Sequence, residues 1–288
     1  MSETGRVRIH TAYLSDAGRV RKENQDACLA LRGPTGEQLL LVADGMGGHK
    51  GGAEASRLLV DGVRERFRSA AVWDLNTLQD AITEGNARIH RAASADVALA
   101  GMGTTAVAVL FGGKGSDAWV AHVGDSRAYR LRDERIERLT EDHSTVAALV
   151  RRGAISEEQA AAHPRRNEIS RSVGAEPNVE IEVAPLDVRV GDCLMLCSDG
   201  LSGVVGDQQI ADALRLLPPR EAVPHLVSAA NENGGPDNVT VMVSALVLDE
   251  EGHVEAPHSG HSGQRMRTIT ASVTVALLLL VVIALLLM

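Results

Sequence analysis

Hydrophobic residues follow two patterns along this chain, short unbroken runs and helical repeats. Residues 39–43 are apolar throughout and are bounded by turn residues, which predicts a strand buried on both faces. From Ala55 to Phe67, apolar residues recur every four positions, which predicts an amphipathic helix. Residues 75–95 show the same period and predict a second helix. Both helices are expected to cover a sheet with their apolar faces.

The same two hydrophobic patterns continue through the rest of the first 248 residues. Further strands are predicted at residues 104–111, 119–123, 127–132, 194–197 and 238–248, and further helices at residues 207–217 and 220–231. The short connection after residue 123 predicts that the strands on either side of it form an antiparallel hairpin. Helix pairs interleaved with such strands predict an α+β fold that would suit two antiparallel sheets with helices outside.

A polar, arginine-bearing stretch at about residues 140–183 interrupts this pattern. Ser144 and Ser156 are placed to cap two short helices within it. From the residues alone, this stretch reads either as a surface helical insertion or as a segment that contacts a ligand.

Four aspartates lie at the ends of predicted strands and beside glycine or other turn residues. They are Asp44, Asp125, Asp199 and Asp237. If these strands share a sheet edge, the four carboxylates converge, and like charges in one cleft then favour proton uptake or a bound cation. Oxygen ligands favour Mg²⁺, Mn²⁺ or Ca²⁺ over zinc or copper. The alternative is that each Asp-Gly pair is only a turn.

Composition narrows the class of protein. The 288 residues are 44% hydrophobic, which suffices for a globular core, and the net charge of −9 argues against nucleic acid as a partner. Cys193 and Cys197 flank an apolar run, so buried thiols are favoured over a metal-binding Cys pair.

The last forty residues have a different character. Residues 249–268 are polar and lack apolar periodicity, which predicts a flexible linker. Residues 269–288 are uncharged and long enough to cross a bilayer as a helix, although a buried core helix has the same composition. Arg265 and Arg267 precede this run, which predicts a single-pass protein in the cell membrane with its large domain in the cytoplasm. Since almost nothing follows the run, it resembles a tail anchor.

Six motifs occur in a fixed order along the chain. They are Arg21-Lys22-Glu23-Asn24-Gln25-Asp26, Asp44-Gly45-Met46-Gly47-Gly48-His49, Gly101-Met102-Gly103-Thr104-Thr105, Gly124-Asp125-Ser126-Arg127, Cys197-Ser198-Asp199-Gly200 and Gly235-Pro236-Asp237-Asn238. In these motifs the chain resembles the bacterial form of the PP2C family, the metal-dependent protein serine/threonine phosphatases. The resemblance implies a four-layer α-β-β-α sandwich over residues 1–248, with residues 140–183 as a mobile flap that contacts the protein substrate.

The resemblance also implies a role for each matching residue. Asp44, Asp199, Asp237 and the carbonyl of Gly45 would hold two Mn²⁺ or Mg²⁺ ions, and Asp125 with Asp199 would hold a weaker third. Arg21 would bind the substrate phosphate, for which a planar guanidinium is suited. Asp26 would hold a metal-bound water. The implied reaction is in-line attack on phosphorus by metal-activated water, without a phosphoenzyme.

One position departs from the pattern of many eukaryotic members, which have a histidine right after the Asp-Gly pair. Here that residue is Met46, which has no proton to donate. His49 is the nearest candidate for the general acid, and metal-bound water is the alternative.

The implied substrates are phosphorylated proteins. Bacterial members often oppose membrane serine/threonine kinases, and a lipid bilayer would be the second partner through residues 269–288. Two rival classes are a catalytically dead binding module on the same fold and a calcium-binding membrane protein. Intact Asp44, Asp199 and Asp237 count against the first, and the absence of EF-hand spacing counts against the second.

Overall fold

The computed structural model describes residues 7–113 and 117–248, and the structural statements below concern these residues. The chain up to Asp249 forms one compact unit. The predicted linker at residues 249–268 and the predicted span at residues 269–288 lie outside the described residues. Within the described residues, every helix is too short or too polar to cross a bilayer.

The strands and helices expected from the hydrophobic pattern are present. The strands are β1 (Val7–Asp16), β2 (Asp26–Arg32), β3 (Gln38–Met46), β4 (Gly103–Thr104), β5 (Ala106–Phe111), β6 (Ala118–Val123), β7 (Arg127–Arg132), β8 (Arg135–Arg138), β9 (Glu182–Pro185), β10 (Cys193–Cys197) and β11 (Val239–Leu248). The helices are α1 (Gly48–Ser69), α2 (Leu75–Ala95), α3 (Thr145–Arg151), α4 (Glu157–Ala161), α5 (Asp199–Ser202), α6 (Asp207–Leu216) and α7 (Pro219–Glu232), with a short 3-10 helix η1 (Val97–Leu99). The predicted strand at 104–111 is divided into β4 and β5, whereas β1, β2, β8 and β9 were not predicted.

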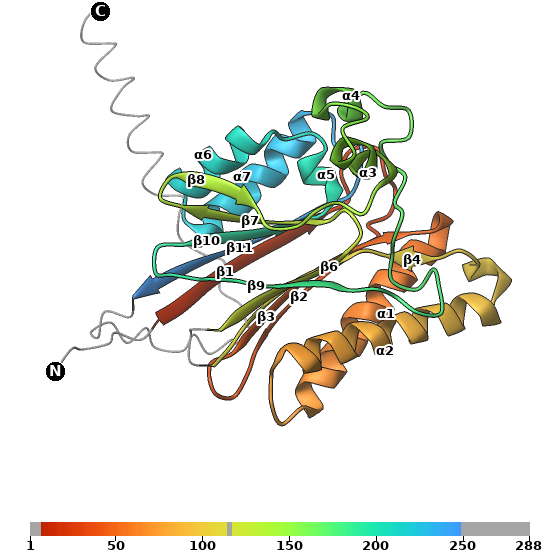
Figure 1. The fold of residues 1–288 in the computed structure, drawn as a ribbon, viewed down its shortest axis with the longest axis horizontal. Helices are drawn as coiled ribbons and strands as arrows, with labels where there is room; N and C mark the ends of the chain where they lie inside the picture. Colours follow the sequence, from red (N-terminus) through yellow and green to blue (C-terminus); the bar gives the residue numbers. More distant parts are fainter. Residues whose placement is uncertain (1–6, 114–116, 249–288) are drawn as a thin grey trace, which may run out of the picture. The chain divides into compact units, whose positions relative to one another are not determined.

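Two antiparallel sheets pack face to face between pairs of helices (Figure 1). Sheet A has the strand order β1-β11-β10-β7-β8, and sheet B has the order β2-β3-β5-β6-β9, with β4 paired to β3. Helices α1 and α2 cover the outer face of sheet B, and α6 and α7 cover the outer face of sheet A. The predicted four-layer α-β-β-α sandwich is therefore confirmed.

Strand β3 shows why an unbroken apolar run was needed. Leu39 and Leu41 point into the core between sheet B and its helices, whereas Leu40 and Val42 point into the core between the two sheets. Successive side chains of a strand face opposite sides, so a strand in an inner layer needs apolar residues at every position. The prediction of burial on both faces is confirmed.

The prediction of an antiparallel hairpin around residue 125 is wrong. Strand β6 pairs with β5 and β9 in sheet B, while β7 pairs with β10 and β8 in sheet A. The chain crosses from one sheet to the other at Gly124, whose φ of 105° is open to glycine and strained for other residues. A short connection alone does not distinguish a hairpin from a crossing between stacked sheets. Asp125 consequently lies where the two sheets meet.

Both cysteines of the possible metal pair are buried thiols. Cys193 and Cys197 begin and end β10, so their α-carbons are about 13 Å apart at the usual rise per residue. Burial raises the pKa of each thiol to about 12. They do not share a metal ion, and the buried alternative is the correct one.

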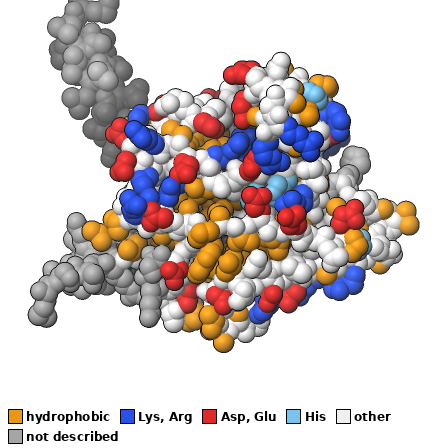
Figure 2. All heavy atoms as spheres, viewed as in Figure 1, with side chains coloured by type: hydrophobic (Ala, Val, Ile, Leu, Met, Phe, Trp, Pro, Cys, Tyr) orange, Lys and Arg blue, Asp and Glu red, His pale blue; other side chains and the backbone are white. Residues whose placement is uncertain are grey.

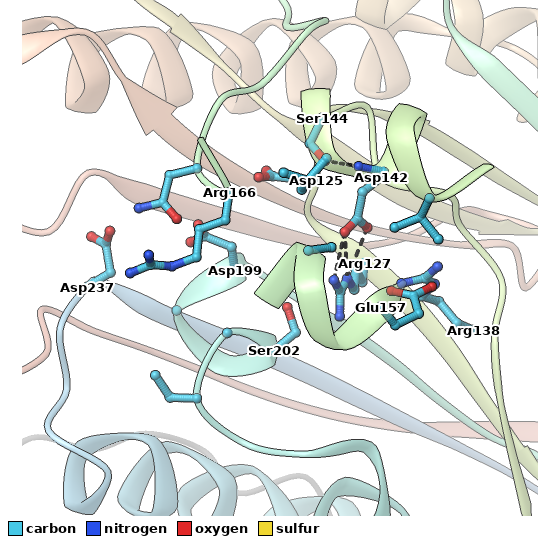
Figure 3. Close-up of a pocket in the computed structure, with 18 of the residues that line it drawn as sticks. Asp125, Arg127, Arg138, Asp142, Ser144, Glu157, Arg166, Asp199, Ser202 and Asp237 are labelled. Atoms are coloured by element: carbon cyan, nitrogen blue, oxygen red, sulfur yellow. Dashed lines mark hydrogen bonds and ion pairs between the residues drawn. The ribbon is translucent and has the colours of Figure 1, made fainter. Parts of the chain in front are cut away.

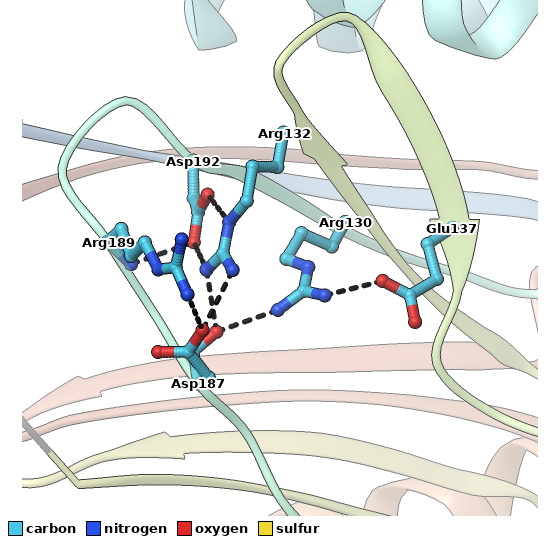
Figure 4. Close-up of polar contacts among 6 residues, drawn as sticks. All are labelled: Arg130, Arg132, Glu137, Asp187, Arg189 and Asp192. Atoms are coloured by element: carbon cyan, nitrogen blue, oxygen red, sulfur yellow. Dashed lines mark hydrogen bonds and ion pairs between the residues drawn. The ribbon is translucent and has the colours of Figure 1, made fainter.

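An ion-pair network fastens the segment between β9 and β10 to sheet A (Figure 4). Arg132 of β7 donates from Nε to Asp192 Oδ1 and from Nη2 to Asp192 Oδ2, both at 2.7 Å, and pairs with Asp187 at 2.8 Å. The Asp192 side chain is only 1% exposed. Acidic and basic side chains are intermixed across the same face of the molecule (Figure 2).

Candidate active site

Asp44 lies near the C-terminal end of β3, directly opposite Asp26 of β2. Its backbone is tied to Thr105, whose hydroxyl accepts from the Asp44 N–H at 2.9 Å and whose N–H donates to the Asp44 carbonyl at 2.8 Å. Gly45 follows, and a Cβ there would lie 2.1 Å from the carbonyl oxygen of Gly52 and 2.5 Å from that of Gln25. Glycine is therefore required because three backbone segments meet behind Asp44.

Asp199 and Asp237 come from sheet A. Asp199 is the first residue of α5, just after β10, and Asp237 precedes β11. Strands β10 and β11 are paired, so the two aspartates are delivered to the same end of the sheet. A Cβ on Gly200 would lie 1.9 Å from the Asn238 carbonyl oxygen, so glycine allows the two segments to touch.

Electrostatics shows that these carboxylates share one site. Burial, followed by the charges of Asp26, Asp199 and Asp125, raises the pKa of Asp44 well above its ordinary value. Burial also raises the pKa of Asp199, and the charge of Asp237 adds to that rise. The pKa of Asp125 rises to about 7, through burial first and then the charge of Asp199. The four aspartates predicted to converge do converge.

Asp26 joins the two sheets beneath this cluster. Its Oδ2 accepts from Ser198 Oγ at 2.8 Å and from Thr240 Oγ1 at 2.7 Å, both in sheet A segments. Its Oδ1 is buried and has no hydrogen-bond partner among the described residues. Burial raises the pKa of Asp26 to about 6, and the charge of Asp199 contributes. Asp26 therefore has one fixed oxygen and one oxygen available for a ligand or a water.

Arg21 lies at the mouth of the site in the loop between β1 and β2. Its Nη2 donates to Asp237 Oδ2 at 2.7 Å. Asn238 holds this loop from below. Its Oδ1 accepts from the Gln25 N–H at 2.8 Å, and its Nδ2 donates to the carbonyls of Ala17 and Glu23, each at 2.9 Å.

The turn that carries Asp125 is also attached to Asp44. Ser126 Oγ lies 2.7 Å from Thr105 Oγ1, the hydroxyl that accepts from the Asp44 N–H. Arg127 forms a bidentate pair with Asp142 in which Nη2 lies 2.7 Å from Oδ2. Asp125 Oδ1 is buried and unpartnered in the described part of the chain.

A cavity of about 620 Å³ opens beside the acidic cluster and runs under the flap (Figure 3). The residues that line it include Asp125, Asp199, Asp237 and Arg21. Its far wall is formed by α3 and α4, whose predicted N-caps Ser144 and Ser156 are both present. In Figure 3, Arg166 extends from the flap toward Asp199 and Asp237. The cavity therefore connects the acidic cluster with the flap.

His49 falls in the first turn of α1, and its side chain lies outside what the structure describes. Its role as general acid stays a prediction.

The residues present fit a divalent metal centre. The donors are carboxylate oxygens, two of which are buried without hydrogen-bond partners among the described residues. Burial and then repulsion between carboxylates raise the pKa values of Asp44 and Asp125, and a bound cation would relieve both effects. Such an oxygen donor set suits Mg²⁺ or Mn²⁺.

Comparison with known protein families agrees with this geometry. Residues 18–237 match the model of the family described as protein phosphatase 2C. The chain belongs to the protein phosphatase 2C family. The predicted resemblance is thereby confirmed, as is the enzyme class, a metal-dependent protein serine/threonine phosphatase.

Relatives of the same family cover most of the chain. The serine/threonine phosphatase stp of Listeria monocytogenes is 37% identical over 252 residues, which is 85% of this chain and 98% of the Listeria protein. The crystal structure of the Mycobacterium tuberculosis phosphatase PstP has a TM-score of 0.76 at 38% identity and covers 83% of this chain and 99% of that one. A structure of the PstP catalytic domain in complex with two manganese ions has a TM-score of 0.75 at 37% identity, covering 84% of this chain and 99% of that one.

The predicted use of Mn²⁺ or Mg²⁺ is confirmed at the level of the protein phosphatase 2C family. Three residues important to the site were not singled out from the sequence. They are Thr105, Ser198 and Asn238, each of which lies within a quoted motif but holds a neighbour rather than a ligand. For Ser198 and Asn238, a hydroxyl or an amide next to an aspartate could have drawn attention, whereas Thr105 has no aspartate beside it in the sequence.

Proposed function

We propose that this chain hydrolyses phosphoserine and phosphothreonine in proteins at a binuclear Mn²⁺ or Mg²⁺ centre. Asp44 would contact both ions, the Gly45 carbonyl would contribute to one, and Asp199 and Asp237 would complete the other. A weaker third ion would be held by Asp125 with Asp199. The observation that carries this proposal is that Asp125, Asp199 and Asp237 line one cavity, while burial and then neighbouring carboxylates raise the pKa values of Asp44 and Asp125.

Divalent cations held by these aspartates would activate water as the nucleophile and would neutralise charge on the phosphoryl oxygens. The residues of the chain provide the positioning. Asp26 Oδ1 has no hydrogen-bond partner in the described part of the chain, and it would accept a hydrogen bond from the attacking water while Ser198 and Thr240 fix the other oxygen. Arg21 is placed beside Asp237 to bind two phosphoryl oxygens.

The serine or threonine oxygen that leaves phosphorus must gain a proton to become a hydroxyl. His49 or water supplies it, and a His49→Ala variant separates the two. If His49 is the donor, kcat for a poorly activated phosphothreonine peptide falls while kcat for p-nitrophenyl phosphate, whose leaving group needs no proton, is retained. If water is the donor, both values stay near the wild type.

The cavity under α3 and α4 supports a phosphopeptide as substrate, because it extends well beyond the acidic cluster. By analogy with bacterial family members, the proposed substrates are phosphoproteins made by a membrane serine/threonine kinase, with which this enzyme would act in opposition.

The test is phosphate release from a phosphothreonine peptide by the full chain, with Mn²⁺, with Mg²⁺ and after chelation. Activity should require the metal and should be lost in Asp44→Asn and Asp199→Asn, whereas Asp212→Asn on the surface of α6 should retain it. An inactive wild type with either metal would favour the binding-module alternative.

We further propose that residues 269–288 tether residues 1–248 to the cytoplasmic face of the cell membrane through the linker at 249–268. Twenty uncharged, mainly apolar residues and the preceding Arg265 and Arg267 support this. The full chain should sediment with membranes and be released by detergent but not by high salt. Removal of residues 250–288 should free it, and sedimentation of that shortened chain would contradict the proposal.

A further inference from the structure

Two histidines, His122 of β6 and His143 near the start of the flap, are stacked next to the Asp125 turn. The rings of His122 and His143 are 4.6 Å apart between centroids, with 23° between their planes, and both residues are buried. Glu182 of β9 completes a group whose potential ligand atoms lie within 4.8 Å of one another. The proposed reaction uses none of the three.

Hydrogen bonding argues against a metal ion in this group. The Gly124 N–H donates to His143 Nδ1 at 3.1 Å, so Nδ1 carries a lone pair and the proton of the neutral ring is on Nε2. That Nε2–H faces Glu182 Oε2 at 3.0 Å. A metal ion on Nε2 would drive the proton to Nδ1, against the Gly124 N–H. The guanidinium of Arg171, 3.3 Å from Nε2, would also repel a cation.

The same contacts make His143 a two-point clamp on Gly124. The His143 backbone N–H donates to the Gly124 carbonyl at 3.0 Å, and the His143 ring accepts from the Gly124 N–H. Gly124 has a φ of 105°, and a Cβ there would lie 2.6 Å from Thr105 Cγ2. The clamp therefore fixes a backbone conformation that sets the direction of the next residue, Asp125.

The backbone of the turn helps to position Asp125, and a backbone hydrogen bond within residue 125 also reaches its carboxylate. Its Oδ1 has no hydrogen-bond partner among residues 7–113 and 117–248, although it is buried. The turn is held on one side by Ser126 and Thr105 and on the other by His143. Loss of the His143 side would leave the carboxylate free to turn away from Asp199.

His143 is itself held from three directions, two at its ring and one at its backbone carbonyl. Glu182 accepts from Nε2, and His122 stacks on the ring face while its own Nε2 donates to the Glu141 carbonyl at 2.8 Å. The His143 carbonyl accepts from the Ser170 N–H at 2.8 Å, within the flap. Through these contacts, His143 holds the start of the flap against the Asp125 turn.

We propose that His143 is a positioning residue whose Nδ1 holds the turn at residues 124–126 in the geometry that Asp125 needs to bind the weaker divalent cation. This rests on the proposed function, because the cation is assigned there. Partners that orient a metal ligand from behind change metal affinity about 10- to 100-fold when they are removed.

Two substitutions separate the Nδ1 contact from bulk and packing. His143→Asn keeps an acceptor at the δ position, whereas His143→Gln keeps a polar group near the ε position and loses the acceptor facing Gly124. Mn²⁺ binding to the full chain is measured by electron paramagnetic resonance of free Mn²⁺. We expect His143→Gln to lower the affinity for the weakest-bound Mn²⁺ about 10-fold or more and to leave the affinities for the tighter ions unchanged. His143→Asn should have affinities near those of the wild type.

The effect must also pass through Asp125. In an Asp125→Asn background, which lacks the weak site, His143→Gln should cause no further change in Mn²⁺ binding. Equal loss in both His143 variants, or a further loss in the Asp125→Asn background, would show a merely structural role and overturn the inference. If His143→Gln does not fold, Glu182→Ala is the second variant, because it removes an exposed contact to the His143 ring. It should also lower the affinity for the weakest-bound Mn²⁺.

The outcome for the wild type distinguishes this inference from the proposed function. A wild type that binds no Mn²⁺ defeats the proposed function. A wild type that binds two tight ions and no weaker one overturns the role of His143 and leaves the binuclear centre standing.

Discussion

Arg21 Nη2 lies 2.7 Å from Asp237 Oδ2, so the arginine expected to bind phosphate is paired with a carboxylate expected to bind metal. Both side chains are accessible, at 56% and 36% exposed, and an exposed pair of this kind is weak. The Arg21 guanidinium can therefore leave Asp237 and bind an incoming phosphate at little cost in free energy. The two roles are linked because one contact must open before the other forms.

Arg21→Ala should lower kcat/KM for a phosphothreonine peptide about 10- to 100-fold, as expected for the loss of charge-assisted hydrogen bonds. Mn²⁺ affinity should be unchanged or tighter, because a competitor for Asp237 is removed. Steady-state kinetics and Mn²⁺ titration check both values. Arg220→Ala, at the start of α7, is the control and should behave as the wild type. A weaker Mn²⁺ affinity in Arg21→Ala would contradict the assigned role.

Without metal, stability should fall as the pH rises. The pKa values of Asp26 and Asp125 are raised to about 6 and about 7, and those of Asp44 and Asp199 are also raised. A raised carboxyl pKa stabilises the fold below the unfolded value, near pH 4, and that contribution is lost as the pH rises through the folded value. Tm in the presence of a chelator should therefore decrease between about pH 4 and about pH 7.

Asp199→Asn is the matched variant for this pH dependence. It removes a charge from the cluster, so its metal-free Tm near pH 8 should exceed that of the wild type, while its stabilisation by Mn²⁺ should disappear. Mn²⁺ should stabilise the wild type more as the pH rises, because protons compete for the same oxygens. Identical pH profiles for the two metal-free proteins would show that the carboxylates do not interact.

Gly200→Ala should disrupt the site through backbone contact alone. Its Cβ would lie 1.9 Å from the Asn238 carbonyl oxygen, so Asp199 or the segment at Asn238 must move. We expect a loss of about 2–3 kcal/mol in the free energy of unfolding, together with loss of activity. Gly206→Ala is the control, because nothing lies within 4 Å of the added carbon, and it should cost less than about 1 kcal/mol. Chemical denaturation and phosphatase assays would compare them.

Asp192→Ala should reduce stability without changing catalysis. Asp192 is buried and forms two hydrogen bonds to Arg132, far from the acidic cluster, so its removal leaves a guanidinium short of partners. The expected cost is about 3 kcal/mol in the free energy of unfolding, with kcat/KM unchanged at a temperature where the variant is folded. Asp212→Ala breaks an exposed pair with Arg215 and an exposed hydrogen bond from Gln208, and it should cost less than about 1 kcal/mol. Similar losses of unfolding free energy in the two variants would contradict the larger contribution assigned to the buried pair.

Elements of the fold were predictable where burial dictates the choice of residue. The unbroken apolar run of β3 and the four-residue period of α1 each reflect a local rule that tertiary structure then obeyed. The failed hairpin at residue 125 shows the limit of such rules. Periodicity identifies a strand but carries no information about which neighbour it pairs with, and β6 and β7 belong to different sheets.

The candidate site divides in the same way. The sequence by itself determined which residues carry the chemistry, because carboxylates at strand ends next to glycine were recognisable as a set, and the family motifs assigned them roles. Only the tertiary structure decided that Asp44 and Asp125 meet Asp199 across two sheets, that Asp26 is fixed by Ser198, and that His143 holds the Asp125 turn. The reason is physical: composition and spacing act along the chain, whereas desolvation, charge repulsion and hydrogen-bond geometry depend on distances that exist only after the sheets have packed.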